Sequence, residues 1–349
     1  MADSSARRGS TGAGLVGRLA DAAVRWRLGL IAYHDVAALE PQAAEDFWSA
    51  SHVADPAPLC ATPVPPGWVR GARALDLRGP SAGPGDHEGA RVLRARAYLN
   101  PAAAPGAPLV LLLHGYAAAV PTYEEHHARL LLRRGLHAAR LDLPHHLRRR
   151  PPGWGAGAGF FSSDPHRTAA ILRQATEDAA AVVAWARDTV GCPVAVLGFS
   201  LGGLVACLLA AAAPLDSMVA VTPPCDLADV VLRRSPLRIR KRLGLVDGGG
   251  GPWGADLAAA HDALAQAMAP VTPHLLAPHT PGDRITLVAA DNDGIVGAAA
   301  VRALASAWGT RLISYPHGHV TVMAARGITA RLHDRLADDL STARRPPLH

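Results

Sequence analysis

The chain has 349 residues, 49% of them hydrophobic, and its 35 basic and 29 acidic residues give a formal net charge of +6. That length and apolar content are ample for one large α/β domain with a buried core. No apolar run reaches the roughly 20 residues that cross a bilayer, so we expect no membrane-spanning segment. Lys241 is the single lysine, so the positive charge reflects an arginine bias and indicates no ligand by itself.

The N-terminal region divides into two predicted parts. We expect residues 1–12 to be a disordered tail and residues 13–66 to form a helical extension and a connector, proline-rich over Pro56–Pro66. Apolar residues recur at helical spacing at Leu15, Leu19, Ala22, Trp26 and Leu30. We expect this face to pack on the body of the protein, and peripheral membrane contact by a basic amphipathic helix is the alternative.

Residues 67–340 carry the pattern of an α/β domain. Two strand candidates, Trp68–Leu77 and Arg91–Leu99, predict an antiparallel edge. Further strands are predicted at Leu109–Leu113, His137–Leu141, Val194–Leu197, Met218–Val221, Ile285–Ala290 and Arg311–Tyr315. Helices are predicted at Tyr123–Arg134, Thr168–Arg187 and Leu201–Ala213 and from Val320. This alternation favours a mostly parallel central sheet with helices on both faces.

Two segments interrupt the alternation. Pro144–Asp164 carries histidines and arginines that either shape a pocket or form a solvated charged run. The residues between about 222 and 282 are far more than a crossover needs, so we expect a lid with a helix over Asp256–Met268. Its arginines, beginning at Arg233, suit anionic lipid headgroups or a solvated basic face. No aromatic residues interleave with them, so no nucleic-acid partner is expected.

The junction at residues 198–202 (GFSLG) predicts a nucleophile elbow. An apolar strand precedes it and a helical stretch follows. A serine at such a turn adopts a strained backbone that tolerates only small neighbours, which explains the glycines two residues before and after Ser200. The alternative is a serine that only caps the following helix.

A nucleophilic serine needs a histidine base and an acid that orients it, expected later in the chain in the order acid, histidine. Asp293 follows the strand Ile285–Ala290 and is the predicted acid, with Asp291 and Asp226 as alternatives. His319 follows the strand Arg311–Tyr315 and is the predicted base, with His317 as the alternative. Each rejected aspartate is expected to cap a helix.

The strand Leu109–Leu113 ends in His114, Gly115 and Tyr116. We expect the backbone amides of Tyr116 and Leu201 to bind the oxyanion of a tetrahedral intermediate. The Tyr116 side chain could line the acyl pocket or add its hydroxyl. The alternative is a plain turn that ends the strand.

No metal or cofactor site is predicted. The histidine pairs are adjacent in sequence, which points their rings to different faces, and no glycine-rich loop is followed by the lysine of a phosphate-binding motif. The four cysteines, Cys60, Cys192, Cys207 and Cys225, lack paired spacing. We therefore expect reduced thiols in a cytoplasmic protein.

From about Trp68 to Leu340, the loop at His114, the elbow at Ser200, Asp293 and His319 occur in the order that resembles the α/β-hydrolase superfamily. The stretch from Leu287 to Thr321, with the N-terminal helix, looks most like bacterial relatives of the α/β-hydrolase domain-containing protein eighteen branch. That resemblance implies lipid or ester hydrolysis near membranes, although the eukaryotic members differ in the loop at His114.

The motifs together predict a serine hydrolase that cleaves a small-molecule carboxylic ester, with a lipid-like substrate as one form. An acyltransferase would use the same residues, with an alcohol or thiol excluding water from the second step. A binding protein on an inactive hydrolase fold is the rival from another class. The acyl and alcohol portions of the substrate and the oligomeric state leave no signal in the sequence.

Overall fold

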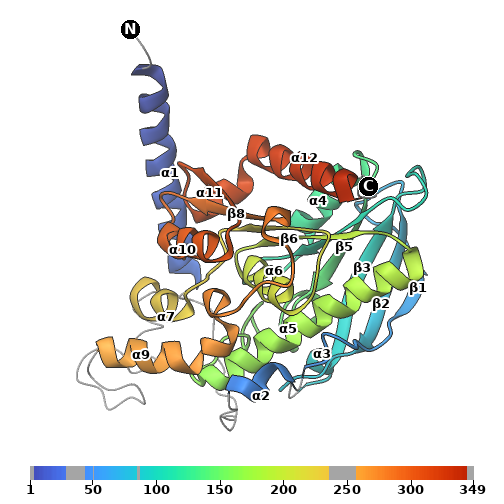
Figure 1. Ribbon diagram of the computed structural model, residues 1–349, viewed down its shortest axis with the longest axis horizontal. Helices are drawn as coiled ribbons and strands as arrows, with labels where there is room; N and C mark the ends of the chain where they lie inside the picture. The colour runs from blue at the N-terminus through green and yellow to red at the C-terminus, as the bar shows by residue number, and fades with distance from the viewer. Residues whose placement is uncertain (1–3, 29–43, 50, 85–86, 236–256, 344–349) are drawn as a thin grey trace, which may run out of the picture.

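The computed structural model describes residues 4–28, 44–49, 51–84, 87–235 and 257–343, with side chains described within 13–26, 46–49, 51–84, 87–235 and 258–341. A single twisted sheet runs through the molecule and helices cover both of its faces (Figure 1). The predicted α/β architecture is confirmed.

The sheet has nine strands in the order β1-β2-β3-β5-β4-β6-β7-β8-β9. The strands are β1 (Cys60–Val64), β2 (Arg73–Pro80), β3 (Val92–Leu99), β4 (Leu109–Leu113), β5 (His137–Asp142), β6 (Val194–Phe199), β7 (Ser217–Val221), β8 (Ile285–Ala290) and β9 (Arg311–Tyr315). The pairs from β1 to β5 are antiparallel, and all pairs among β5, β4, β6, β7, β8 and β9 are parallel. The carboxyl ends of the parallel strands therefore share one rim, where open α/β sheets bind their ligands.

The described helices are α1 (Ser4–Leu28), α2 (Ala44–Ser49), α3 (Glu88–Arg91), α4 (Thr122–Leu132), α5 (Pro165–Trp185), α6 (Leu201–Ala212), α7 (Leu227–Asp229), α9 (Leu257–Ala267), α10 (Ala298–Trp308), α11 (His319–Ala324) and α12 (Arg326–Ala343). Short helical turns are η1 (Leu147–Arg149), η2 (Ala186–Val190), η3 (Val230–Arg234), η4 (Ala269–Val271), η5 (Pro273–Leu275) and η6 (Gly282–Arg284). No described helix is both long enough and apolar enough to cross a membrane.

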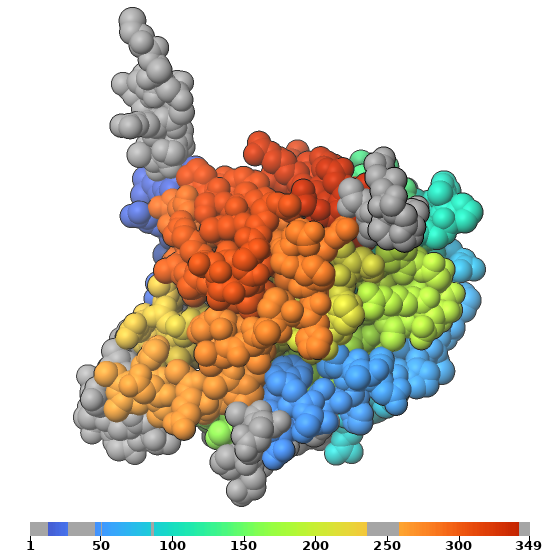
Figure 2. Space-filling view, viewed as in Figure 1, coloured from blue at the N-terminus to red at the C-terminus, as the bar shows by residue number. Residues whose placement is uncertain are grey.

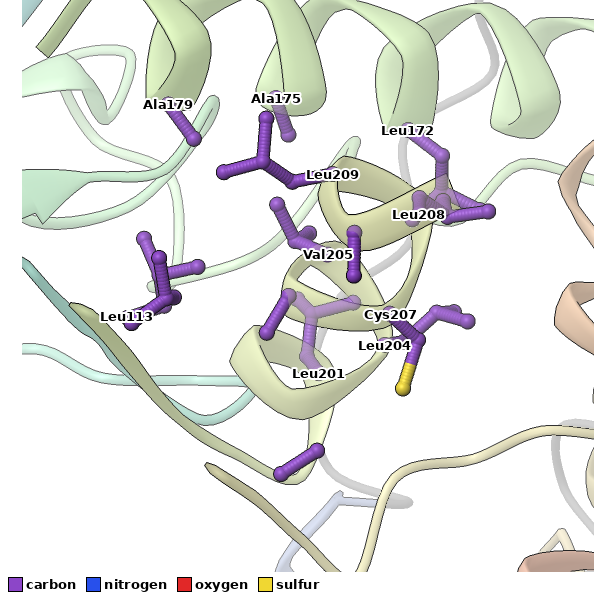
Figure 3. Packing of buried hydrophobic residues seen from close by; sticks show 14 of the residues in the cluster. Leu113, Leu172, Ala175, Ala179, Leu201, Leu204, Val205, Cys207, Leu208 and Leu209 are labelled. Carbon is purple, nitrogen blue, oxygen red and sulfur yellow. The ribbon is translucent and has the colours of Figure 1, made fainter. Parts of the chain in front are cut away.

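The core lies in two layers, one on each face of the sheet. Helices α5, α6, α9 and α10 contribute to the larger layer, and α4 and α12 to the other. In the larger layer α6 lies between the sheet and α5, and Ala175 and Ala179 of α5 leave room for Leu209 of α6 (Figure 3). This packing buries α6 from Leu201 to Ala210 and so gives the elbow that precedes it a rigid support.

The structure differs from expectation at the N-terminus. Residues 4–12, expected to be a disordered tail, belong to the helix α1. The connector contains an unpredicted strand, β1, because Pro63 is tolerated at a sheet edge where a central strand would exclude it. Strand β2, the first strand of the predicted antiparallel pair, begins at Arg73, five residues later than predicted. Trp68 therefore lies in the preceding turn.

The apolar face of α1 points away from the body, contrary to expectation. Leu15, Leu19 and Trp26 are 62%, 64% and 70% exposed, whereas Gly14, Gly17 and Asp21 are buried. The described side chains of α1, in blue, lie against the orange and red surface of the C-terminal part of the chain (Figure 2). A narrow face of small residues lets this helix approach the body closely.

The predicted lid is described only in part. Its helix is present as α9, close to the predicted bounds, while residues 236–256 lie outside the described residues, as do the basic residues 238 and 240–242. Arg233 and Arg234 both pair with Asp229, Arg234 at 2.5 Å. The lid itself stays a prediction.

Candidate active site

Ser200 stands at the turn between β6 and α6. Its backbone has φ 50° and ψ −115°, a strained conformation for a residue with a side chain. A Cβ at Gly198 would overlap the carbonyl oxygen of Gly202, and a Cβ at Gly202 would overlap that of Leu113. The two glycines thus allow the turn to form against β4, as an elbow requires. The Ser200 side chain makes no cap bond to α6, which excludes the capping interpretation.

The side chains of Ser200, His319 and Asp293 form a continuous hydrogen-bonded chain at the shared rim. His319 Nε2 lies 2.9 Å from Ser200 Oγ, and His319 Nδ1 lies 2.8 Å from Asp293 Oδ2. His319 and Asp293 are both buried residues, at 3% and 8% exposed. With the proton on Nδ1, the ring donates to Asp293 and accepts from the serine hydroxyl.

Asp293 is held as an ionised carboxylate. Burial favours its neutral form, but the adjacent His319 and the N–H groups of Ile295 and Val296 outweigh that effect, so the pKa of Asp293 lies below its ordinary value. Both N–H groups donate to Oδ1 at 2.8 Å, which leaves Oδ2 for the imidazole. The apolar pair after Asp293 therefore anchors the acid through its backbone.

The alternative residues lie elsewhere. Asp291 is partly exposed and pairs with Arg302 at 2.5 Å. Asp226 caps α7 by accepting the N–H of Asp229 at 2.9 Å, the predicted role of a rejected aspartate. The backbone N–H of His317 donates to the carbonyl of Tyr315, and no bond joins the His317 ring to Ser200 or Asp293 within the described residues.

The loop after β4 lies beside the elbow. An added Cβ on Gly115 would stand 3.6 Å from Cβ of Ser200, so this loop borders the serine directly. His114 shapes its start: Nδ1–H donates to the carbonyl of Gly115 at 2.8 Å, and Nε2 accepts the N–H of Leu143 at 3.1 Å. Burial lowers the pKa of His114 to about 4, which keeps the ring neutral and able to accept.

The segment Pro144–Asp164 supports this loop, and its His145, His146 and Arg149 are buried, so it is not a solvated charged run. His146 Nε2 accepts the N–H of Ala117 at 3.1 Å, and its Nδ1–H donates to the carbonyl of Pro144 at 2.7 Å. The ring of Tyr116 packs edge-on against His146. Arg149 is fully buried and pairs with Asp178 at 2.6 Å.

The chain resembles known proteins in its fold. A sequence model of the alpha/beta hydrolase fold matches residues 108–243. Acetyl xylan esterase 1 from Thermoanaerobacterium sp. JW/SL YS485 is similar with a TM-score of 0.62 and 15% identity, over 90% of this chain and 98% of that one. The chain has the α/β-hydrolase fold.

Other esterases share this hydrolase fold. The acetyl xylan esterase from Paenibacillus sp. R4 has a TM-score of 0.60 and 13% identity, over 87% of this chain and 96% of that one. A carboxyl esterase from Bacillus coagulans has a TM-score of 0.50 and 13% identity, over 77% and 98%. No curated protein matches the chain.

Sequence reasoning missed one buried group at the rim of this α/β-hydrolase sheet. Asp21 of α1 is 1% exposed, and its carboxylate accepts backbone N–H groups from the loops that carry Asp293 and His319. The available signal was the spacing of Gly14, Gly17 and Asp21, which share one side of a helix. A side of small residues opposite a side of apolar residues indicates that a helix has two contact faces. The periodicity of the apolar residues predicts only one of them.

The arrangement suits nucleophilic chemistry by side chains and backbone. No group of three or more histidine, cysteine, aspartate or glutamate side chains in the described part of this hydrolase fold could hold a metal ion. The hydroxyl of Ser200, the imidazole of His319 and the carboxylate of Asp293 are in contact. A hydroxyl, a base and an orienting acid are the set needed to form and resolve an acyl-enzyme.

Proposed function

We propose that this chain is a serine hydrolase that cleaves carboxylic esters. The observation that carries the proposal is the hydrogen-bonded chain from Ser200 Oγ through His319 to Asp293, at 2.9 and 2.8 Å. These residues come from three loops that follow β6, β8 and β9, so no local sequence constraint brings them together. The esterase activity named for similar structures supports the ester class and assigns no substrate.

The proposed reaction has two balanced steps. Ser200 Oγ bonds to the ester carbonyl carbon as its proton moves to His319 Nε2. The tetrahedral intermediate then breaks its bond to the alcohol oxygen, and His319 returns the proton to that oxygen. In the second step water attacks the acyl-enzyme with the same histidine as base, which releases the acid and restores Ser200. Asp293 holds the ring and stabilises its charged form.

The oxyanion is expected to bind two backbone amides, those of Tyr116 and Leu201. Leu201 follows the nucleophile directly, and Tyr116 belongs to the loop that borders Ser200. The buried, neutral His146 accepts the N–H of Ala117, the residue after Tyr116, and so supports the Tyr116 amide. Removing one such donor from a serine hydrolase lowers kcat by about 10²- to 10³-fold.

The test combines a covalent probe with a substrate series. A fluorophosphonate should label the native chain once, and Ser200→Ala should abolish both labelling and hydrolysis. Ser314→Ala, at an exposed position on the edge strand β9, is the matched control and should change neither. Labelling that persists in Ser200→Ala would point to another nucleophile, and a native chain that never labels would favour the non-catalytic rival.

Substrate class needs its own measurement. A panel of acyl esters of graded chain length, assayed for kcat/KM, distinguishes short-chain from lipid-like preference. The same panel with added alcohols separates hydrolysis from acyl transfer, because a transferase yields a new ester in place of the free acid. The finer resemblance to the α/β-hydrolase domain-containing protein eighteen branch stays a prediction, which a preference for long acyl chains would support.

A second candidate function, binding to an anionic lipid surface, is favoured by the outer face of α1. Leu15, Val16, Leu19 and Trp26 are each at least 60% exposed there. Arg25 of the same helix complements anionic headgroups. Cosedimentation with anionic vesicles should fall in Leu19→Ser and at high salt. Equal sedimentation with neutral vesicles, or self-association of the free chain through this face, would contradict lipid binding.

A further inference from the structure

The inner face of α1 contacts both loops that carry the proposed acid and base. Its one buried charged group within the described side chains is Asp21. Oδ2 of Asp21 accepts the N–H of His319 at 2.8 Å and that of Gly294 at 2.9 Å, and Oδ1 accepts the N–H of Val320 at 3.0 Å. One carboxylate thus binds three backbone amides from two segments.

Two of these amides belong to the first turn of α11. His319 and Val320 are its first residues, and the residue before them, Gly318, has no side chain with which to accept their N–H groups. Buried N–H groups left without an acceptor are costly. Asp21, about 300 positions earlier, therefore supplies the acceptor that α11 lacks, and the residue it fixes is the proposed base.

The third amide connects Asp21 to the proposed acid. Gly294 follows Asp293 directly, so the contact with Asp21 fixes the backbone next to the acid, while the N–H groups of Ile295 and Val296 hold its carboxylate. The loops after β8 and β9 meet at the Asp21 side chain. Their relative position decides whether Asp293 and His319 stand within hydrogen-bond distance.

Small residues allow this contact. A Cβ on Gly17 would overlap the backbone nitrogen of Gly318, and one on Gly14 would stand 2.9 Å from the side-chain nitrogen of Asn292. Arg18 donates to Oδ1 of Asn292 through Nε at 3.2 Å and Nη2 at 3.0 Å. Four residues of α1, spaced over two turns, are thus fitted to the two loops, which a helix resting loosely on the surface would not require.

We propose that Asp21 is a positioning residue of the active site, which holds the acid loop and the histidine loop in register for proton transfer. The proposal rests on the serine hydrolase function proposed above. Asp21 touches no reacting atom and lies behind the backbone of His319, so its loss should lower kcat and leave KM unchanged. A displacement of about 1 Å at the reacting groups can cost about 10²-fold in rate.

The test compares two substitutions of the same type in the full chain. Asp21→Asn places an amide N–H₂ against backbone donors. Asp291→Asn alters a carboxylate in the loop after β8 that faces Arg302 instead. Asp21→Asn should lower kcat and the fluorophosphonate labelling rate by about 10²-fold with KM unchanged. Asp291→Asn should keep both rates.

Amide hydrogen exchange supplies the readout that general destabilisation would not reproduce. In Asp21→Asn the amides of Gly294, His319 and Val320 should lose protection, while those of the central strand β6 keep theirs. Should that variant unfold at the assay temperature, Gly17→Ala takes its place, because it keeps the carboxylate and forces α1 away from Gly318. Selective loss at the same three amides with lowered kcat then supports the proposal.

Each contrary outcome has a distinct meaning. Native-like kcat and labelling in Asp21→Asn would overturn the positioning role and leave the serine hydrolase function standing. A lowered kcat with uniform loss of protection across the sheet in both Asp21→Asn and Gly17→Ala would also overturn it, since that result describes global unfolding. A native chain that neither labels nor hydrolyses any ester would refute the proposed function, and the positioning role with it.

Discussion

The carboxylate of Asp21 accepts the backbone N–H of His319 at 2.8 Å, although the two residues lie 298 positions apart in the chain. The same imidazole contacts Ser200 and Asp293 through its two ring nitrogens. His319 is thus held at its backbone by the start of the chain and at its ring by residues from the middle and the end. Its orientation is a property of the whole fold.

Replacing the proposed acid should cost activity more than stability. In Asp293→Asn the amide can donate to His319 Nδ1, which favours the wrong ring tautomer and leaves Nε2 unable to accept the serine proton. We expect kcat to fall about 10⁴-fold, as in other Ser-His-Asp enzymes. Steady-state kinetics on the best ester of the panel check this. Retention of more than a tenth of the native kcat would contradict the role of Asp293.

The proposed oxyanion site predicts that the Tyr116 amide matters and its hydroxyl does not. Tyr116→Phe should keep kcat near the native value, whereas Tyr116→Pro, which removes the N–H, should lower it about 10²- to 10³-fold. Circular dichroism should show both variants folded. A large loss of kcat in Tyr116→Phe would instead assign the hydroxyl to catalysis.

The elbow should reject a methyl group at Gly198. The added Cβ of Gly198→Ala would overlap the carbonyl oxygen of Gly202, so the free energy of unfolding should fall by about 1–3 kcal/mol. Gly327→Ala is the matched control, because no atom lies within 4 Å of its added Cβ and it belongs to α12. That variant should be as stable as the native chain or slightly more so. Urea unfolding of both variants checks the pair, and equal stabilities would contradict the packing argument.

Buried imidazoles should make the fold sensitive to mild acid. Burial lowers the pKa of His114 to about 4, that of His145 to about 3 and that of His333 to about 4. The pKa values of His127 and His146 also lie well below normal, chiefly through burial. Between about pH 6.5 and 4 the unfolded chain therefore binds more protons, so the free energy of unfolding falls as pH falls.

Buried carboxyls oppose this trend without reversing it. Burial raises the pKa of Glu124 to about 7 and also raises those of Glu177 and Asp178. These three groups bind protons preferentially in the folded chain, and they are fewer than the buried imidazoles. Urea unfolding at pH 7.5, 6.5 and 5.5 should show a progressive loss of stability, and a constant value would show that the imidazoles are not held neutral.

Much of the fold follows from local patterns. Three strands have the bounds that their sequences predict: Leu109–Leu113, Ile285–Ala290 and Arg311–Tyr315. Each is an uninterrupted run of strand-forming residues flanked by turn residues or glycine. The order of serine, acid and histidine along the chain predicts Ser200, Asp293 and His319 as the site residues. The structure brings these three side chains into contact. Their catalytic role stays a proposal.

The failures have a common physical origin. Helical periodicity predicts which residues of α1 share a face, but it does not predict which face contacts the rest of the protein. Here Gly17 and Asp21 make that contact in place of the apolar residues. In the sequence, Asp21 is a single aspartate among arginines and so resembles a solvated residue, because its partners lie in distant loops. Arg149 is similar, since its burial depends on Asp178, 29 positions away.

The attachment of α1 also bears on the order of assembly during translation. This helix is synthesised before every strand of the described sheet, yet the surface that receives its inner face comes from residues 292–321. A domain generally folds as a unit. The docking surface of α1 is therefore complete only after the last strand of the described sheet has been made, so the proposed active site can close only late in synthesis.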